Sequence, residues 1–373
     1  MQKLPIPHAA ALLFTAAVVS DLRPALAPSI GVVEWVATAA LVVILFDGGA
    51  SIGLRRFRSA AVPIALLGIP GTFATAGLVA LFLHAVLGLG WLTAGLLAAA
   101  VAPTDPAVMF SVLGDREIEG RTDTVLEGES GANDPVGIAL MIGLIELATH
   151  ADETFWVVVR VFCLQMAVGL AVGIVGGLLE ARLLPRTGRY AFLPALAVAP
   201  LVFGVAYLAH GSGFLAVFVA GLIRGDAELP HQRSVVELRE RMASVAEVVV
   251  FIALGLTVNL SGIGGARWAE GLLVAAFLAL IARPVVCAAL LARVNLDVGE
   301  KVFVAWAGLK GAVPILLAAL AVGHHVDDAQ RIYETVFVVV LASVIVQVSS
   351  IPLAARALGV EATPLDEPSA SGP

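Results

Sequence analysis

Charged residues are scarce in this sequence of 373 residues. They account for 14% of the chain, whereas hydrophobic residues account for 60%. Because soluble domains carry about 25% charged residues, the composition excludes an ordinary soluble protein. Two cysteines are too few for a disulfide framework. The sequence shows no nucleotide-binding fingerprint and no soluble domain, so we expect neither a nucleic-acid partner nor a nucleotide-binding domain.

Long apolar segments make up most of the sequence. A helix needs about 20 mostly apolar residues to cross a bilayer, whereas a membrane β-barrel would show shorter segments that alternate in polarity. These segments are apolar all round, so we predict an all-α polytopic membrane protein with about twelve transmembrane helices. The predicted spans are 6–24, 31–50, 60–84, 90–113, 123–148, 155–179, 190–209, 212–224, 240–260, 268–291, 300–322 and 331–355.

The positive charges predict the orientation of these spans. If the N-terminus and alternate loops lie on one side, that side collects 16 of the 22 Lys and Arg residues, and the other side only Arg23, Arg267 and Arg331. The positive-inside rule places the first side in the cytoplasm. We therefore predict a multi-pass protein in the lipid bilayer of the plasma (inner) membrane, with both termini cytoplasmic. Residues 1–360 form the membrane domain, and the polar, Pro-rich residues 361–373 are predicted to be a short disordered cytoplasmic tail.

Two of the predicted spans contain helix-breaking residues near their middle. The fourth contains APTDP, around Thr104 and Asp105, and the eleventh contains GLKGAVP, around Lys310. Proline removes a backbone donor and clashes with the preceding turn. The two spans cross the membrane in opposite directions, and such a pair of interrupted helices indicates a transporter built from inverted repeats, with its site near the midplane. Asp105 and Lys310 are expected to compensate the half-helix dipoles, and ion binding stays open for Asp105.

The fifth span carries the polar sequence GESGANDPVG. Residues four apart share a helix face, so Ser130 and Asp134 form one polar stripe, and Glu129 and Asn133 form another. The hydroxyl and carboxylate of the first stripe are hard oxygen ligands that suit a small alkali cation. The carboxylate of the second stripe can pair with a buried cation such as Lys310 or Arg283.

Acids outnumber bases deep within the predicted spans. The bases are Lys310 and Arg283, and the acids are Asp47, Asp105, Glu129, Asp134 and Glu247. Five acids against two bases leave three carboxylates in excess. Burial disfavours a bare charge, so such a carboxylate either is protonated or holds a cation, and alternation of the two ions amounts to antiport. We take Asp134 as this carboxylate, leave a packing role open for Asp47 beside two glycines, and interpret Glu247 and Gln347 as structural.

The motifs together resemble those of the monovalent cation:proton antiporters of the sodium/hydrogen exchanger type, in particular the bacterial NhaP-like sodium(potassium)/proton antiporters. They occur in the family's order along nearly the whole chain: LFDGG, APTDPAVMFSVLG, EGESGANDPVGIAL, EVVVFIALGL, IARPV and GLKGAVPILLA. The resemblance implies a core bundle with two crossed, broken helices, which moves against a scaffold bundle that forms a homodimer.

The resemblance also implies the roles of individual residues. Asp134 would bind cation and proton alternately, Ser130 and Thr104 would complete the site for Na⁺ or K⁺, Asp47 would be a further ligand, and Asp105 would lie near the site.

A structural ion pair is also implied, between Glu129 and Lys310, which stands where the family usually has arginine. Asn133, where electrogenic relatives have a second aspartate, suggests one-for-one, electroneutral exchange.

The expected function is therefore secondary active transport and not an enzymatic reaction. A monovalent alkali cation, Na⁺ or K⁺, would be exchanged for H⁺ by alternating access, without a cofactor, in the service of pH homeostasis. The alternatives are another cation-coupled secondary transporter, such as a symporter, and a cation channel, which needs a continuous pore and no obligate proton exchange. An intramembrane aspartyl protease is disfavoured because the sequence has no GxGD stretch.

Overall fold

Helices make up the regular structure of the protein. The computed structural model describes residues 8–105, 109, 118, 121–150, 152–183, 192–226 and 232–360. Over these ranges the predicted all-α class is confirmed, whereas residues 361–373 and the end of the fourth predicted span lie outside them. The elements are α1 (His8–Leu22), η1 (Pro24–Leu26), α2 (Ile30–Ser59), α3 (Ala61–Leu66), η2 (Leu67–Gly71), α4 (Thr72–Leu87), α5 (Trp91–Val101), α7 (Thr122–Thr149), α8 (Trp156–Leu183), α9 (Phe192–Leu208), α10 (Gly213–Gly225), α11 (Gln232–Gly255), α12 (Gly265–Phe277), η5 (Leu278–Ala282), α13 (Arg283–Leu290), α14 (Val298–Trp306), α15 (Ala312–Gly323), α16 (Ala329–Ala342), η6 (Ser343–Val348) and α17 (Ser349–Ala357).

The helices have the length and exposure of membrane spans. Six helical stretches within the described ranges are long and apolar enough to cross a membrane, and shorter apolar helices accompany them. Helices satisfy their own backbone hydrogen bonds, as hydrocarbon surroundings require. Large aromatic side chains are exposed near the helix ends predicted to face outward, among them Trp35, Trp91 and Trp156. Such aromatic residues are enriched at membrane–water interfaces.

Two helices extend well beyond the boundaries predicted from hydropathy. The second predicted span ends at residue 50, but α2 continues to Ser59, with a kink at Gly53, whose φ is 70°. The ninth is predicted to begin at residue 240, but α11 already begins at Gln232. A span predicted from hydropathy ends at the first cluster of charged residues, but the helices continue past it. In α2 the Arg55 amide donates a hydrogen bond to Asp226, and in α11 Arg239 pairs with a carboxylate.

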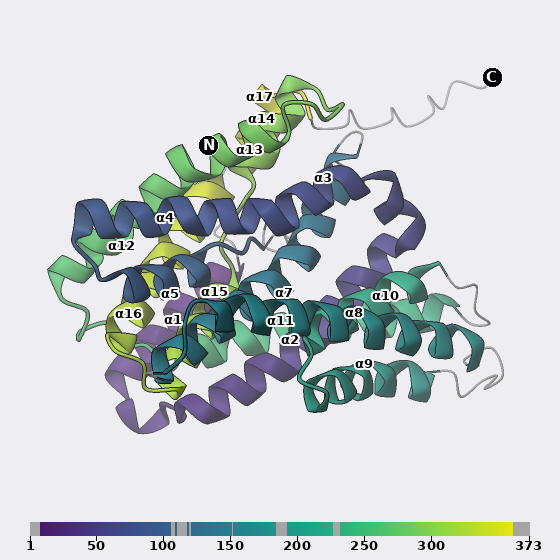
Figure 1. Cartoon of the computed structure of the whole chain (residues 1–373), viewed down its shortest axis with the longest axis horizontal. Helices are drawn as coiled ribbons and strands as arrows, with labels where there is room; N and C mark the ends of the chain where they lie inside the picture. The colour runs from purple at the N-terminus through teal and green to yellow at the C-terminus, as the bar shows by residue number, and fades with distance from the viewer. Residues whose placement is uncertain are drawn as a thin grey trace, which may run out of the picture.

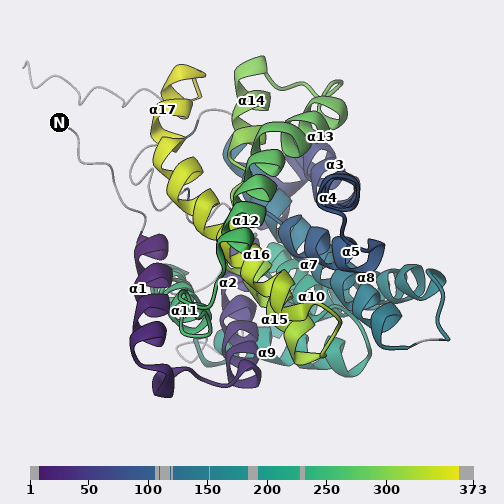
Figure 2. The same cartoon turned by 90° about the vertical axis from the view of Figure 1, so that its left-hand side faces the viewer.

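The helices form two groups that meet at the centre of the molecule. The α2–α10 bundle contains α1, α2 and α8 to α11, and the α5–α15 bundle contains α3 to α5, α7 and α12 to α17. In Figures 1 and 2 the first group lies low, whereas α3, α4, α13 and α14 lie high. Helices α5 and α7 lie between them in both views. Segments far apart in the sequence therefore converge where the two bundles face each other.

Close packing of small residues holds α10 between α2 and α8. A side chain at Gly49 of α2 would run into the backbone of α10, where its Cβ would lie 3.0 Å from the Leu222 nitrogen and closer still to the Phe218 carbonyl oxygen. On the other side, the backbone of α10 at Ala216 lies close to Gly173 of α8. Small residues that allow such backbone approach stabilise helix pairs in membranes, where burial of apolar surface contributes little.

Gly49→Ala is expected to destabilise the protein by about 1–3 kcal/mol, because the added methyl group meets rigid backbone atoms. Thermal unfolding of the purified protein in detergent would measure the change. Gly48→Ala is the matched control, since a Cβ at the adjacent position meets nothing within 4 Å. Equal unfolding temperatures for the two variants would contradict this account of the α2–α10 contact.

Candidate functional site

Two interrupted helices meet at the centre of the molecule. α5 ends at Val101, and the chain from residue 102 to residue 105 is not helical. α14 ends at Trp306, and helical structure resumes at Ala312 in α15. The Asp105 amide donates a hydrogen bond of 2.9 Å to the Leu309 carbonyl. Both breaks therefore occur where the proline and glycine residues predict them, and the two non-helical segments are in direct contact.

The charged residue at each break lies at a helix end created by the other break. The Lys310 ammonium is buried and donates to the carbonyl oxygens of Ala102 and Pro103, at 2.9 and 2.8 Å, just beyond the C-terminal end of α5. The Asp105 carboxylate lies against Gly311, the residue that precedes α15, where any Cβ would collide with it. A cation at a helix C-terminus and an anion at an N-terminus both offset the helix dipole. The charges thus stabilise two half-helices that face each other.

The buried ion pair of α7 joins Glu129 to Arg283. Arg283 donates through Nη1 and Nη2 to the two carboxylate oxygens of Glu129, at 2.5 and 2.7 Å. The structure corrects the pairing with Lys310 that the family resemblance implies. The physical reason is that the planar guanidinium matches both carboxylate oxygens, whereas the Lys310 ammonium is engaged by carbonyl groups at the other break.

Asn133 fixes α7 to the first break. Its side-chain nitrogen donates to the Thr104 hydroxyl at 2.8 Å, and its oxygen accepts from the Thr104 amide at 3.3 Å. Both residues are buried. The neighbouring Asp134 is therefore held in a fixed place relative to the unwound segment around Thr104.

Hydrogen bonds from the π-helical segment η6 hold the second break. The Lys310 amide donates to the Ser343 hydroxyl at 3.0 Å, and that hydroxyl donates to Gln347 Oε1 at 2.6 Å. Gln347 Nε2 donates in turn to the Trp306 carbonyl at 3.0 Å. A π-helical turn is often found at functional sites. The structural role predicted for Gln347 is therefore specific: Gln347 and Ser343 satisfy backbone groups that the broken helix leaves without partners.

Gln347→Leu is expected to destabilise the protein by about 1–3 kcal/mol, because it leaves the partly buried Trp306 carbonyl and the buried Ser343 hydroxyl without this partner. Thermal unfolding again provides the measurement. Gln330→Leu is a suitable control, since it removes an exposed hydrogen bond to Glu334 one helix turn away. A Gln347 variant as stable as the Gln330 variant would show that the hydrogen-bonded chain does not hold the break.

A cavity of about 370 Å³ opens between the two bundles beside the breaks. The α2–α10 bundle contributes residues of α2, α10 and α11, and the α5–α15 bundle contributes residues of the first break, α7 and α15. Six acids and no base are among the described residues that line it: Asp47, Asp105, Glu127, Asp134, Glu240 and Glu247. A cleft lined by charge of one sign raises the local concentration of the opposite ion. The cavity therefore favours cations.

Asp134 is the most deeply buried of these acids, with 4% of its surface exposed. Its Oδ1 atom is buried and has no hydrogen-bond partner among the residues that the structure describes. Ser130 lies one turn before it on the same helix face and also lines the cavity. An oxygen that is buried and unsatisfied costs free energy unless a proton or a cation reaches it. The group is therefore suited to hold either ion.

The structure places Asp47 in the same cavity, but gives it a partner. Arg239 of α11 donates to the Asp47 carboxylate. This pair is not apparent from the sequence, because Arg239 precedes the predicted span 240–260 and would lie in a loop. Glu247, which it interprets as structural, lines the cavity with Asp134.

Glu127 and Glu240 are further cavity residues that the sequence analysis does not single out. Glu127 carries a recognisable signal, since it precedes Ser130 by three residues and Asp134 by seven, a spacing that keeps all three on one helix face.

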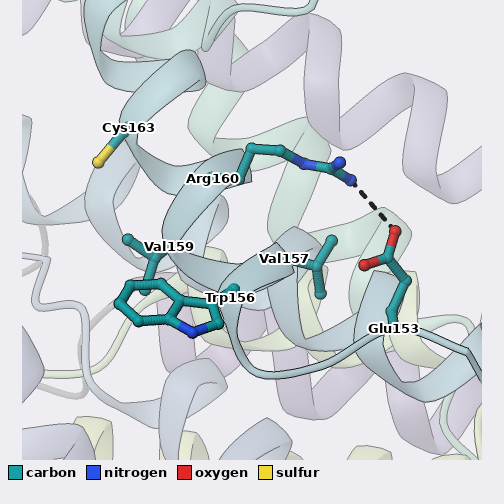
Figure 3. A pocket seen from close by; sticks show the side chains of 6 residues that line it. All are labelled: Glu153, Trp156, Val157, Val159, Arg160 and Cys163. Atoms are coloured by element: carbon teal, nitrogen blue, oxygen red, sulfur yellow. Dashed lines mark hydrogen bonds and ion pairs between the residues drawn. The ribbon is translucent and has the colours of Figure 1, made fainter.

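A second hollow lies at the start of α8 and contains no buried acid. Glu153, Trp156 and Cys163 line it, and Arg160 reaches Glu153 across 3.3 Å (Figure 3). The Arg160 side chain is 66% exposed. An exposed pair of this kind is screened by solvent, so this hollow is not the candidate site.

Comparisons with known proteins agree with the fold and the motifs. The chain is 36% identical over 345 residues to the K⁺/H⁺ antiporter NhaP of Alkalimonas amylolytica, which covers 91% of this chain and 59% of that protein. It is 28% identical over 326 residues to the Na⁺/H⁺ antiporter ApNhaP of Aphanothece halophytica, with 82% and 61% covered. The chain spans about three fifths of the length of these curated relatives.

A solved structure and a family model extend this likeness. The fold is that of the sodium proton antiporter MjNhaP1 from Methanocaldococcus jannaschii, with a TM-score of 0.83, 22% identity, and 96% of this chain and 94% of that chain covered. The model described as sodium/hydrogen exchanger, transmembrane, matches residues 1–357. The chain therefore belongs to the sodium/hydrogen exchanger family.

Proposed function

We propose that the chain exchanges a monovalent alkali cation, Na⁺ or K⁺, for H⁺ across the membrane by alternating access. The observation that carries the proposal is Asp134, a buried carboxylate with an unsatisfied oxygen, which lines a cavity of acids at the meeting point of two broken helices. The names of the relatives, antiporters of K⁺ or Na⁺ against H⁺, support the same class of substrate.

In this proposal Asp134 holds a cation and a proton in turn. Ser130 and Thr104 supply neutral oxygen ligands, and Asp105 adds negative charge to the cavity wall, whereas the charge of Asp47 is balanced by Arg239. Binding of either ion satisfies the Oδ1 atom, and the two ions exclude each other because they need the same carboxylate. Asn133 is neutral and bound to Thr104, so one carboxylate changes its occupant in each cycle, and the exchange is electroneutral.

The proposal extends to the topology. Twelve spans in two inverted repeats would place both termini in the cytoplasm, and Glu127 and Glu240 near the cytoplasmic ends of α7 and α11. The cavity would then open to the cytoplasm. The α5–α15 bundle would be the moving core, and the α2–α10 bundle the scaffold, through which two copies form a homodimer in the plasma membrane. Convergence of the two bundles on the cavity supports this division.

Proteoliposomes that contain the purified chain and a fluorescent pH probe would test the function. A proton gradient is imposed, and Na⁺ or K⁺ is added with and without a potassium/valinomycin clamp of the membrane potential. We expect one of the cations to dissipate the gradient equally in both conditions, and the cation that acts identifies the substrate.

A signal that changes with the clamp would refute the electroneutral stoichiometry. Cation flux without any proton movement would favour a channel. Silence with both cations, from protein shown to be folded, would refute the antiport proposal for this chain.

A further inference from the structure

An internal ion pair neutralises one acid of the cavity. Nε of Arg239 donates to Asp47, and its Nη2 lies 3.5 Å from the Ser51 hydroxyl. Asp47 and Ser51 line the cavity, whereas Arg239 is not among the described residues that do so. The side chains of Arg239 and Asp47 are only 14% and 16% exposed. The Arg239 guanidinium therefore binds the Asp47 carboxylate without lining the cavity itself.

Arg239 lies near a second buried ion pair. A second buried ion pair, Arg224–Glu180, joins α10 to α8 at 3.1 Å. Arg239 interacts electrostatically with both of its members. Within these two ion pairs the charges of two arginines and two carboxylates cancel, and loss of the Arg239 charge would leave one net negative charge among them. Such a charge, close to a low-dielectric wall, acts strongly on a cation in the cavity.

We propose that Arg239 sets the affinity of the cavity for the transported cation. Its guanidinium is a tethered cation that competes with the transported ion for the Asp47 carboxylate. In the wild-type protein Asp47 is neutralised by Arg239, so the cation is held chiefly at Asp134. The inference rests on the proposed function for the identity of the ion, and it gives Asp47 a different role from that of a direct ligand.

Four variants separate the two roles of Asp47. Arg239→Gln frees the carboxylate and should lower the dissociation constant for Na⁺ or K⁺ by about threefold to tenfold, the effect of one charge at the cavity wall. Asp47→Asn leaves the guanidinium without its partner and should raise the constant by a similar factor. The double variant replaces a neutral pair by two neutral side chains and should bind as the wild type does. Arg239→Lys keeps the charge and should preserve the affinity.

Cation binding is measured by the concentration that half-saturates thermal stabilisation of the purified full chain in detergent. Arg241→Gln serves as the matched control, because Arg241 is exposed on the same helix and its replacement should leave the constant unchanged. The apparent KM and the maximal rate of exchange are measured in parallel in proteoliposomes. A merely structural role would lower the yield or the rate and leave the dissociation constant as it is.

Two results would overturn the inference. One is an Arg239→Gln variant that binds no more tightly than the wild type. The other is a double variant as weak as Asp47→Asn, which would make Asp47 an obligatory ligand, and this test stands even if Arg239→Gln alone does not fold. Because binding needs no proton gradient, the expected shifts in affinity without any exchange would refute the proposed antiport and leave the role of Arg239 intact.

Discussion

Asp134→Asn is expected to abolish cation-driven proton release while the protein remains folded. Asparagine keeps the shape of the side chain but can neither bind a proton nor balance the charge of a cation. The measurement is the proteoliposome assay described above, with equal amounts of wild-type and variant protein. The same variant should unfold at a temperature equal to or higher than that of the wild type, because a buried ionisable group is removed from surroundings that disfavour its charge.

The two measurements together distinguish a transport site from a structural acid. Asp327→Asn, which changes an exposed acid beyond α15, should alter neither exchange nor stability. A folded Asp134→Asn variant that exchanges at the wild-type rate would refute the assignment of the site. A variant that is much less stable than the wild type would instead assign Asp134 to the scaffolding of the bundle.

The second large effect concerns the ion pair of Glu129 and Arg283. Arg283→Met leaves a carboxylate without its partner among apolar surroundings, and we expect a loss of stability of about 3–5 kcal/mol. Thermal or denaturant-induced unfolding would show it. The double variant Glu129→Gln/Arg283→Met removes the isolated charge and should recover a large part of the loss, since much of the cost lies in the unpaired ion and not in the absent contact.

The exposed pair of Figure 3 offers the control for this prediction. Arg160→Met breaks a salt bridge to Glu153 that is largely exposed, and exposed pairs contribute about 1 kcal/mol or less. If Arg283→Met and Arg160→Met shift the unfolding temperature equally, burial does not determine the contribution of the pair, and the account of Glu129 is wrong.

Hydropathy and helix breakers were sufficient to predict the helical class and the two interruptions, because both depend on local composition. The same is true of the stripe of Ser130 and Asp134, which depends only on helical spacing. Partners across the fold could not be predicted in this way. Whether Glu129 meets Arg283 or Lys310 depends on how three helices cross, and both bases satisfy the charge balance.

Arg239 illustrates the limit most clearly. A charged segment at a helix end has the composition of a loop, and only the packing of α11 against α2 brings Arg239 to Asp47. Because Arg239 lies outside the predicted spans, the count of acids and bases within them leaves it out. That count therefore overstates by one, Asp47, the number of carboxylates without a cationic partner. The hydrogen bonds of Gln347 cannot be predicted from the sequence for the same reason, since they join the π-helical extension of α16 to a break about 40 residues earlier.

The direct contact between the two breaks has a consequence for the energetics of transport. The Asp105–Leu309 hydrogen bond and the bonds from Lys310 to Ala102 and Pro103 join both unwound segments into one unit. Under the proposed mechanism this unit moves as a whole, so Thr104 and the attached Asp134 accompany the ion to either side of the membrane. Asp47 and Arg239 belong to the α2–α10 bundle and stay in place, so they act on the affinity at one face. An electroneutral cycle nevertheless has no preferred direction of its own, whatever the affinity at each face. The concentrations of cation and proton on the two sides alone decide which way it runs.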